Sequence, residues 1–154
     1  MKLTTDRCLI RNLTMEDAED LYYVLSDERV MAYIEPAFDM ERTKDFIRTA
    51  GLCEPPLVYA IVWKRTGKVI GHVIFHAYEP CDYEIGWIIN RDYWGQGIAD
   101  EVTKELIKYA KASGISSCII ECDTEQEASK HIALKNGFIY KGKRGKLEYY
   151  QLIL

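Results

Sequence analysis

The sequence predicts a single domain of the α+β (mixed α/β) class over residues 1–154. Its length fits one domain, because about 150 residues per domain is the usual expectation. Its composition, 48% hydrophobic and 29% charged, is close to the average of globular chains. Strand-like and helix-like segments follow in the order β-α-α-β-β-β-α-β-α-β-β, which is the pattern of a mixed fold.

A strand and two helices are predicted first. The run Leu9-Ile10-Arg11 ends a short strand, and Thr14–Asp17 is a candidate capping box that begins a helix. The positions that share one face of this helix are Ala18, Leu21, Tyr22 and Leu25. Residues 40–51 form a second short helix, and Pro55-Pro56 prevents its continuation.

Three strand-like runs follow, at residues 57–64, 68–78 and 81–89. The turn Thr66-Gly67 joins the first two, so these are predicted to form a hairpin. Gly86 lies inside the third run. A glycine within a strand often marks a bulge or the close approach of another backbone.

The second half of the chain contains the strongest predicted helix, at residues 98–113, after a loop at 90–97. Its apolar face consists of Ile98, Val102, Leu106, Tyr109 and Ala110. The remaining predicted elements are a strand at 115–122, a helix at 126–136 closed by Gly137, and two strands at 138–140 and 147–154 around a basic turn at 141–146.

The charge balance excludes several classes of function. Twenty Lys and Arg against 24 Asp and Glu give a net charge of −4, which disfavours binding to nucleic-acid phosphates. No apolar run approaches the roughly 20 residues of a membrane helix. Charges interrupt the apolar stretch near residue 10, so no signal peptide is predicted.

The cysteine and histidine positions predict neither disulfides nor a metal site. The five cysteines are Cys8, Cys53, Cys81, Cys118 and Cys122, an odd number without CxxC spacing. We therefore expect a reduced, cytoplasmic protein. His72 and His76 fall on one face of a strand, but no third ligand lies at a suitable spacing, so packing or surface placement is the preferred interpretation.

The segment Trp94-Gly95-Gln96-Gly97-Ile98-Ala99 joins a strand to the long helix and carries the most chemical information. Its glycines allow a sharp turn and close contact with a ligand. The helix start has unpaired N–H groups and a partial positive charge, which suit a phosphate or pyrophosphate. By itself the GxG pattern is more simply explained as a tight strand-to-helix turn. The chain has no P-loop motif and no GxGxxG dinucleotide fingerprint.

Together with the preceding Tyr83–Ile89, this segment resembles the acetyl-CoA-binding motif of the GNAT N-acetyltransferases. It is most similar to the Rim-type branch, which acetylates the N-termini of ribosomal proteins. Two further regions share the resemblance: Leu9–Arg11 with Thr14 and Asp17 resembles the opening strand and helix of that branch, and Asp123–Phe138 resembles its second cofactor segment.

The resemblance implies the GNAT fold, with a central, mixed but mostly antiparallel sheet flanked by about four helices. Acetyl-CoA would lie between the strand at 81–89 and the strand at 115–122, with pantetheine along the first and pyrophosphate on the glycine loop. The implied cofactor-binding residues are Trp87, Ile88, Ile89, Gly95, Gln96, Gly97, Ile98, Ala99, Gln126 and Ser129.

The implied reaction is direct attack of a neutral amine on the thioester. Glu84 is the candidate base, acting through a water, and a strand N–H near Ile88 is the candidate donor to the carbonyl oxygen. Ser129 is the candidate proton donor to the thiolate, with Tyr140 as the alternative. From the strand pattern alone, Glu84 is equally a solvent-facing residue, and Ser129 is more simply a helix-surface residue.

Three departures from the family pattern affect the expected contacts. Asp92 stands where the family often has Gln or Arg, and Gln126 stands where Rim-type chains usually carry an Asn that contacts CoA. Gln126 either keeps this contact with its longer reach or loses it. The segment between the first two helices is short, and the family builds part of the acceptor site there. These departures leave the acceptor less defined than the cofactor.

The predicted function is transfer of acetyl from acetyl-CoA to a primary amine through a ternary complex, without a metal. The acceptor is either a protein N-terminus or a small-molecule amine, and neither nucleic acid nor membrane is an expected partner. Exposed sheet edges favour a homodimer. The alternative is a non-catalytic module of this fold that binds an acyl-CoA or a partner protein.

Overall fold

The computed structural model describes residues 1–154 and contains one eight-stranded sheet in the order β1-β2-β3-β4-β5-β6-β8-β7. The strands are β1 (Leu3–Thr4), β2 (Cys8–Arg11), β3 (Val58–Trp63), β4 (Val69–Glu79), β5 (Asp82–Ile89), β6 (Ser117–Asp123), β7 (Ile139–Arg144) and β8 (Leu147–Ile153). Only β5 and β6 pair in parallel, so the sheet is mixed but mostly antiparallel, as the sequence predicted.

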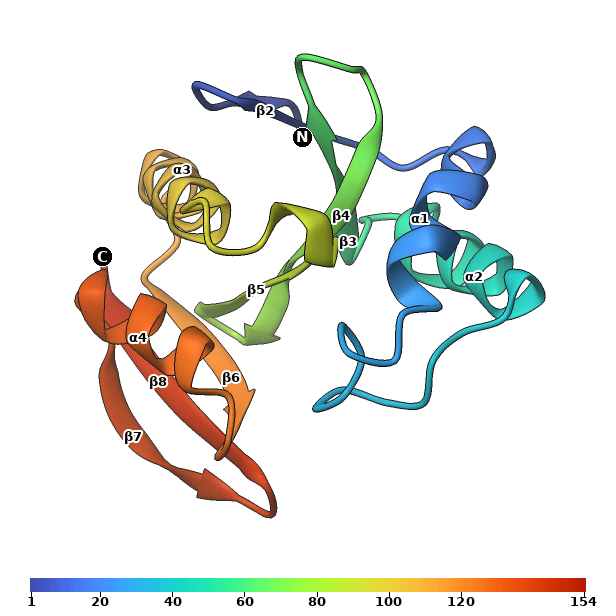
Figure 1. The fold of residues 1–154 in the computed structure, drawn as a ribbon. Coiled ribbons are helices and arrows are strands. Elements are labelled where there is room, and N and C mark those ends of the chain that lie inside the picture. The colour runs from blue at the N-terminus through green and yellow to red at the C-terminus, as the bar shows by residue number, and fades with distance from the viewer.

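Four α-helices flank the sheet, which also confirms the prediction (Figure 1). They are α1 (Ala18–Leu25), α2 (Met40–Phe46), α3 (Ile98–Ala112) and α4 (Glu127–Lys135), with short helical turns at Met15–Asp17, Ile47–Gly51 and Arg91–Tyr93. None of the helices combines the length and the apolar character that crossing a membrane requires.

Two segments differ from their predicted structure. The two-residue β1 was not predicted, because so short a strand has no readable alternation. The predicted basic turn at 141–146 is wrong over most of its length, since β7 continues to Arg144 and only two residues form the turn. Its lysines and arginine are compatible with a strand because β7 lies at the sheet edge, where charged side chains face solvent.

Each face of the sheet has its own apolar core, because alternate strand residues point to opposite faces. On one face α3 and α4 pack on a cluster that includes Ile61, Phe75 and Ile85. On the other face α1 and α2 pack on a cluster that includes Val58, Val62 and Ile88. Figure 1 shows the two helix pairs on opposite sides of the sheet.

The candidate capping box before α1 is confirmed. The Thr14 N–H donates to the Asp17 carboxylate at 2.8 Å, and the Arg11 guanidinium donates two bonds of 2.9 Å to the same carboxylate. Asp17 is buried, with 6% of its surface exposed. Burial acts to raise the pKa of Asp17, but the bonds from Arg11 and Thr14 outweigh it and lower that pKa. This ion pair connects the end of β2 to the start of α1.

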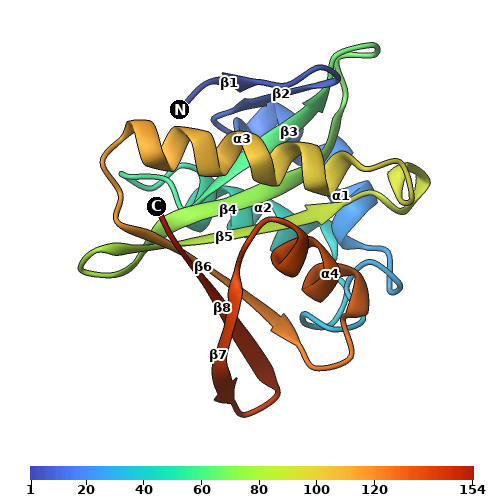
Figure 2. The same cartoon turned by 90° about the vertical axis from the view of Figure 1, so that its left-hand side faces the viewer.

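The parallel pair β5–β6 separates part of the way along. Its last paired residues are Glu84 and Ile119, whereas β5 continues to Ile89 and remains paired with β4 there. Figure 2 shows β6, β8 and β7 running at an angle to β4 and β5. Beyond Glu84, the edge of β5 that faces β6 has no strand partner. Its backbone groups are therefore available to a ligand, apart from the Ile89 carbonyl, which accepts the Trp94 Nε1–H.

Candidate functional site

A cavity of about 220 Å³, here called the strand cleft, lies where β5 and β6 separate. Its wall includes Glu84, Gly86, Trp87 and Ile88 from β5 and Ile120, Glu121 and Cys122 from β6. Consecutive residues of a strand point to opposite faces of the sheet. Because consecutive residues of both strands line the strand cleft, it runs through the sheet from one face to the other.

The glycine loop, residues 94–99, leads into α3. Gly95 and Gly97 have φ angles of +73° and +78°, a left-handed region that favours glycine. A side chain at Gly95 would meet nothing within 4 Å, so its backbone conformation rather than lack of space selects glycine there. The N–H groups of Ile98 and Ala99 lie in the first turn of α3, where no preceding turn supplies acceptors.

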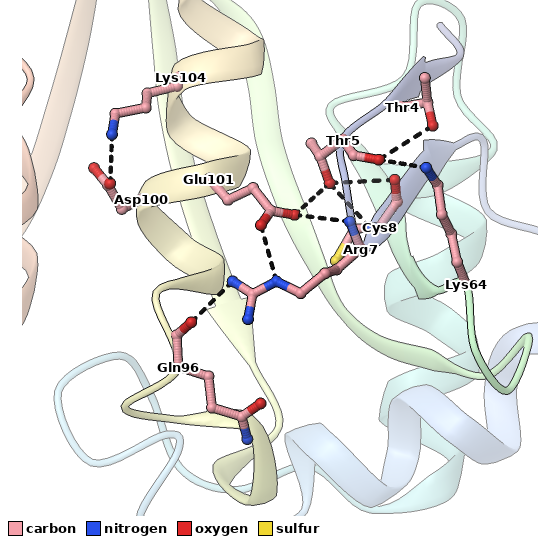
Figure 3. A network of polar contacts seen from close by, with 9 residues as sticks. All are labelled: Thr4, Thr5, Arg7, Cys8, Lys64, Gln96, Asp100, Glu101 and Lys104. Atoms are coloured by element: carbon pink, nitrogen blue, oxygen red, sulfur yellow. Dashed lines mark hydrogen bonds and ion pairs between the residues drawn. The ribbon is translucent and has the colours of Figure 1, made fainter.

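Arg7 anchors the glycine loop to the beginning of the chain (Figure 3). Its Nη2 donates to the carbonyl oxygen of Gln96 at 2.8 Å, and its Nε donates to Glu101 at 2.9 Å. The Thr5 hydroxyl donates to the other oxygen of Glu101 at 2.6 Å. The loop is therefore held from residues about 90 positions away, which sequence analysis did not foresee because no local motif marks Arg7.

Asp100, also in the first turn of α3, is neutralised within the chain. It accepts from Lys104 at 2.7 Å, from Lys135 at 3.0 Å and from Asn136 at 2.8 Å. Burial acts to raise the pKa of Asp100, but these hydrogen bonds lower it to about 2. The contacts join the start of α3 to the end of α4, and they offset a negative charge beside the glycine loop.

Gln126 and Ser129, two of the predicted cofactor-binding residues, both line the strand cleft from the start of α4. The Gln126 side-chain oxygen accepts the Asp123 N–H at 2.7 Å, so this oxygen is already used within the chain. Ser129 is half-buried. The start of α4 thus brings Gln126 and Ser129 to the wall of the strand cleft that faces β5.

Glu84 and His76 form a pair at the inner end of the strand cleft. They are opposite each other in the β4–β5 ladder, and His76 Nε2 lies 3.2 Å from Glu84 Oε2. The hydrogen bond to Glu84, assisted by one to the Ala77 carbonyl, raises the pKa of His76, while burial opposes it. Sequence analysis assigned His76 to packing or surface placement. The register of the β4–β5 hairpin places His76 opposite Glu84, so the sequence reveals this pair only when the register is known.

A second cavity of about 240 Å³, here called the histidine chamber, lies between β4–β5 and the helices α1 and α2. His72, His76 and Glu84 line it, and most of its other lining residues are apolar. It shares Ile34, Ile74, Glu84 and Ile88 with the strand cleft. The two cavities therefore adjoin at these four residues, of which Glu84 is the only one with a charged side chain.

The other predicted residues are placed as follows. Trp87, Ile88 and Ile89 lie on the part of β5 that β6 leaves unpaired, and the Ile89 carbonyl accepts the Trp94 Nε1–H at 2.8 Å. Tyr140 does not line either cavity. It lies on the edge strand β7, half exposed, with its ring 5.6 Å from that of Tyr150.

Cys122 lines the strand cleft but is not suited to nucleophilic attack. Burial raises the pKa of its thiol to about 11, and the nearby carboxylates add to this effect. The thiolate is the nucleophilic form of cysteine, so Cys122 is in the unreactive form near neutral pH. No three or more His, Cys, Asp or Glu side chains are grouped to hold a metal ion.

Comparison with known proteins identifies the family. Residues 7–139 match the family model described as the acetyltransferase (GNAT) domain. The chain is 31% identical over 167 residues to YnaD, an uncharacterized N-acetyltransferase of Bacillus subtilis, and the match covers 100% of this chain and 97% of YnaD. The chain belongs to the GNAT acetyltransferase family.

Two further matches are to ribosomal-protein acetyltransferases of the Rim type, in agreement with the resemblance noted in the sequence. The ribosomal-protein-serine acetyltransferase of Escherichia coli is 32% identical over 88 residues, covering 55% of this chain and 49% of that protein. The structure of RimL, the ribosomal L7/L12 alpha-N-protein acetyltransferase, in complex with coenzyme A has a TM-score of 0.87 at 19% identity. That match covers 100% of this chain and 98% of RimL and shows the same fold.

Proposed function

We propose that this acetyltransferase transfers the acetyl group of acetyl-CoA to a primary amine, with both substrates bound at once. The observation that carries the proposal is the strand cleft, which runs through the sheet and adjoins the histidine chamber at Glu84. A thioester entering from one face can thus meet an amine entering from the other. The acceptor is either a protein N-terminus or a small-molecule amine.

The proposed position of acetyl-CoA follows from the groups that are free to bind it. The pyrophosphate binds the N–H groups of the glycine loop and the first turn of α3, because anion recognition needs donors with a favourable dipole. The pantetheine arm lies along the unpaired edge of β5 at Trp87–Ile89. Gln126 and Ser129 face it from α4. The RimL structure with coenzyme A supports this choice of cofactor.

The proposed chemistry is a direct transfer. The amine nitrogen attacks the thioester carbon, a C–N bond forms, and the C–S bond breaks. Glu84 accepts the amine proton through a water, and a β5 N–H near Ile88 donates to the carbonyl oxygen as it gains charge. Ser129 gives a proton to the departing thiolate and regains one from solvent. His76 orients the Glu84 carboxylate through their pair.

Calorimetric titration with acetyl-CoA, coenzyme A and NAD tests the cofactor part of this proposal. We expect both CoA species to bind and NAD not to bind. The Gly97→Glu variant is expected to lose at least about 100-fold in affinity, because it places a carboxylate at the anion site and a side chain on left-handed backbone.

The matched control is Gly114→Glu, which has the same left-handed backbone (φ +76°) and open surroundings at the opposite end of α3. This variant is expected to bind acetyl-CoA normally. Absence of binding to the unmodified protein at millimolar acetyl-CoA would overturn the cofactor assignment. Binding without transfer to any amine of a screen would instead favour the non-catalytic acyl-CoA-binding module.

A further inference from the structure

The wall of the histidine chamber includes His72, whose side chain has a buried polar atom that the protein leaves without a partner. His72 is 2% exposed, and its Nδ1 has no hydrogen-bond partner. Burial lowers the pKa of His72 to about 4, so the ring is neutral near pH 7 and carries one donor and one acceptor nitrogen. A buried polar group without a hydrogen bond destabilises the protein, so a ligand that supplies the bond gains a corresponding advantage.

The surroundings of His72 favour an aromatic ligand. The ring of Phe46 lies 5.0 Å from the His72 ring at 53°, and the ring of Phe38 lies 5.9 Å from that of Phe46 at 70°. All three rings line the same chamber. Tilted and edge-on arrangements are those that aromatic rings prefer, and a further ring placed in this cluster gains both apolar burial and such contacts.

The opposite end of the histidine chamber is acidic. Glu84, paired with His76, lies there at the junction with the strand cleft. His72 and His76 are four residues apart on one face of β4, which corresponds to about 13 Å along a strand. An amine held near Glu84 therefore has its reactive nitrogen at one end of the chamber and a free hydrogen-bonding position at the other.

We propose that the acceptor is a phenolic amine, an amine nitrogen joined by two carbons to a 4-hydroxyphenyl ring, and that the histidine chamber binds the ring with the hydroxyl on His72. This inference rests on the proposed acetyl transfer for the position of the amine beside Glu84. The same unit occurs in free tyramine and in a peptide whose first residue is tyrosine. Both sources share the chemistry that the chamber recognises.

The spacing and the charges disfavour other amines. A phenolic amine is long enough to place its nitrogen at the Glu84 end of the chamber and its hydroxyl at the His72 end, whereas a short alkyl amine leaves His72 unpaired. A polyamine would bring a second ammonium among Phe38, Phe46 and a neutral His72. The other carboxylate in the chamber wall, Glu35, is already paired with Arg42 and does not balance that charge. A hydroxyl can donate or accept, so it serves either tautomer of His72.

The proposal is tested with pairs of amines that differ only by the hydroxyl group. The pairs are tyramine with phenethylamine, and a short peptide beginning with Tyr with one beginning with Phe. Spermidine and a peptide beginning with Ser serve as unrelated amines. Acetyl transfer gives kcat/KM for each, and calorimetric titration in the presence of coenzyme A gives binding without turnover.

We expect the hydroxylated member of each pair to be preferred at least about tenfold, both in binding and in kcat/KM, because its partner leaves a buried nitrogen unpaired. In His72→Phe, which keeps an aromatic ring against Phe46, this ratio should fall to about one. In His72→Gln, which restores a hydrogen-bonding group, part of the preference should return. If His72→Phe fails to fold, the ratio measured with His72→Gln still tests the proposal.

Equal binding of the paired amines by the unmodified protein would overturn the proposal, and so would a ratio unchanged in His72→Phe or a preference for spermidine or the Ser peptide. Because the titration needs no turnover, its result stands even if no amine is acetylated. Acetylation of other amines together with poor binding of phenolic amines would remove this inference and leave the proposed function intact. Preference for tyramine or for the Tyr peptide identifies the source of the phenolic unit.

Discussion

The strand cleft with its glycine loop and the histidine chamber meet at Glu84 but are built by different means. The glycine loop presents backbone N–H groups from consecutive residues at the start of α3. The histidine chamber is made of side chains from α1, the segment between α1 and α2, α2 with the turn after it, β3, β4 and β5, including Leu25, Phe38, Phe46 and His72. Backbone N–H groups can bind a pyrophosphate whatever side chains the loop carries. Side chains, in contrast, determine which small molecule or peptide fits a cavity.

The glycine loop and the histidine chamber are each supported by an arginine at one end of β2. Arg7, just before β2, bonds to Glu101 of α3 and to the glycine loop. Arg11, at the end of β2, bonds to Asp17 at the start of α1, whose last residue, Leu25, lines the histidine chamber. One short strand thus supports the helix on each face. The two ion pairs differ in burial mainly at the carboxylate, because the Glu101 side chain is 20% exposed and the Asp17 side chain 8%, whereas Arg7 and Arg11 are 37% and 32% exposed.

The largest effect, on kcat, is expected at Glu84, where the strand cleft and the histidine chamber meet. We expect Glu84→Gln to lower kcat by about 10²–10⁴-fold, because an amide cannot take the amine proton, and to leave the affinity for acetyl-CoA unchanged. Steady-state kinetics and titration with acetyl-CoA measure the two quantities separately. Glu79→Gln is the control, since Glu79 is exposed on the same hairpin and lines neither cavity. Full activity of Glu84→Gln near pH 7 would remove Glu84 as the base.

A smaller effect, on stability, is expected at the ion pair of Arg11 and Asp17, which supports α1 beside the histidine chamber. Asp17→Asn should lower the free energy of unfolding by about 2 kcal/mol at pH 7, because the charged bonds from Arg11 are lost. The folded pKa of Asp17 lies below its unfolded value of about 3.9. Its contribution is therefore present above pH ~4 and disappears as the pH falls through the folded pKa.

Chemical unfolding of both proteins from pH 7 down to pH 2 measures this difference. Asp6→Asn is the matched control, because Asp6 is exposed near the same strand. A difference between the protein and Asp17→Asn that stays constant down to the lowest pH would show that the loss arises from packing and not from the charged pair.

The smallest effect, on acetyl-CoA affinity, is expected where Arg7 contacts the glycine loop. Arg7→Gln should weaken acetyl-CoA binding about fivefold, roughly 1 kcal/mol, because the glycine loop loses its bond at Gln96 while Thr5 still holds Glu101. Titration with acetyl-CoA measures the change, and Arg65→Gln in the exposed β3–β4 turn is the control. Unchanged affinity would mean that the loop keeps its shape without Arg7.

The sequence by itself determined the features that arise from neighbouring residues. The capping box at Thr14–Asp17, the apolar face of α3 and the glycine loop are local, since each depends on backbone conformation or periodicity within a few residues. The family resemblance rests on these local motifs and correctly predicted the mixed sheet with four helices. Strand ends were less well predicted: β7 reads as a basic turn because an edge strand can carry charges.

Only the tertiary structure decided which distant side chains meet. The pairing of His76 with Glu84 depends on the register of two strands, and the anchoring of the glycine loop by Arg7 joins residues about 90 positions apart. The same holds for Tyr140, which the sheet order places two strands from β6 and outside the strand cleft. His72 is an ordinary strand residue in the sequence. Packing of α2 on β4 buries it without a partner, and this burial makes it a candidate for acceptor recognition.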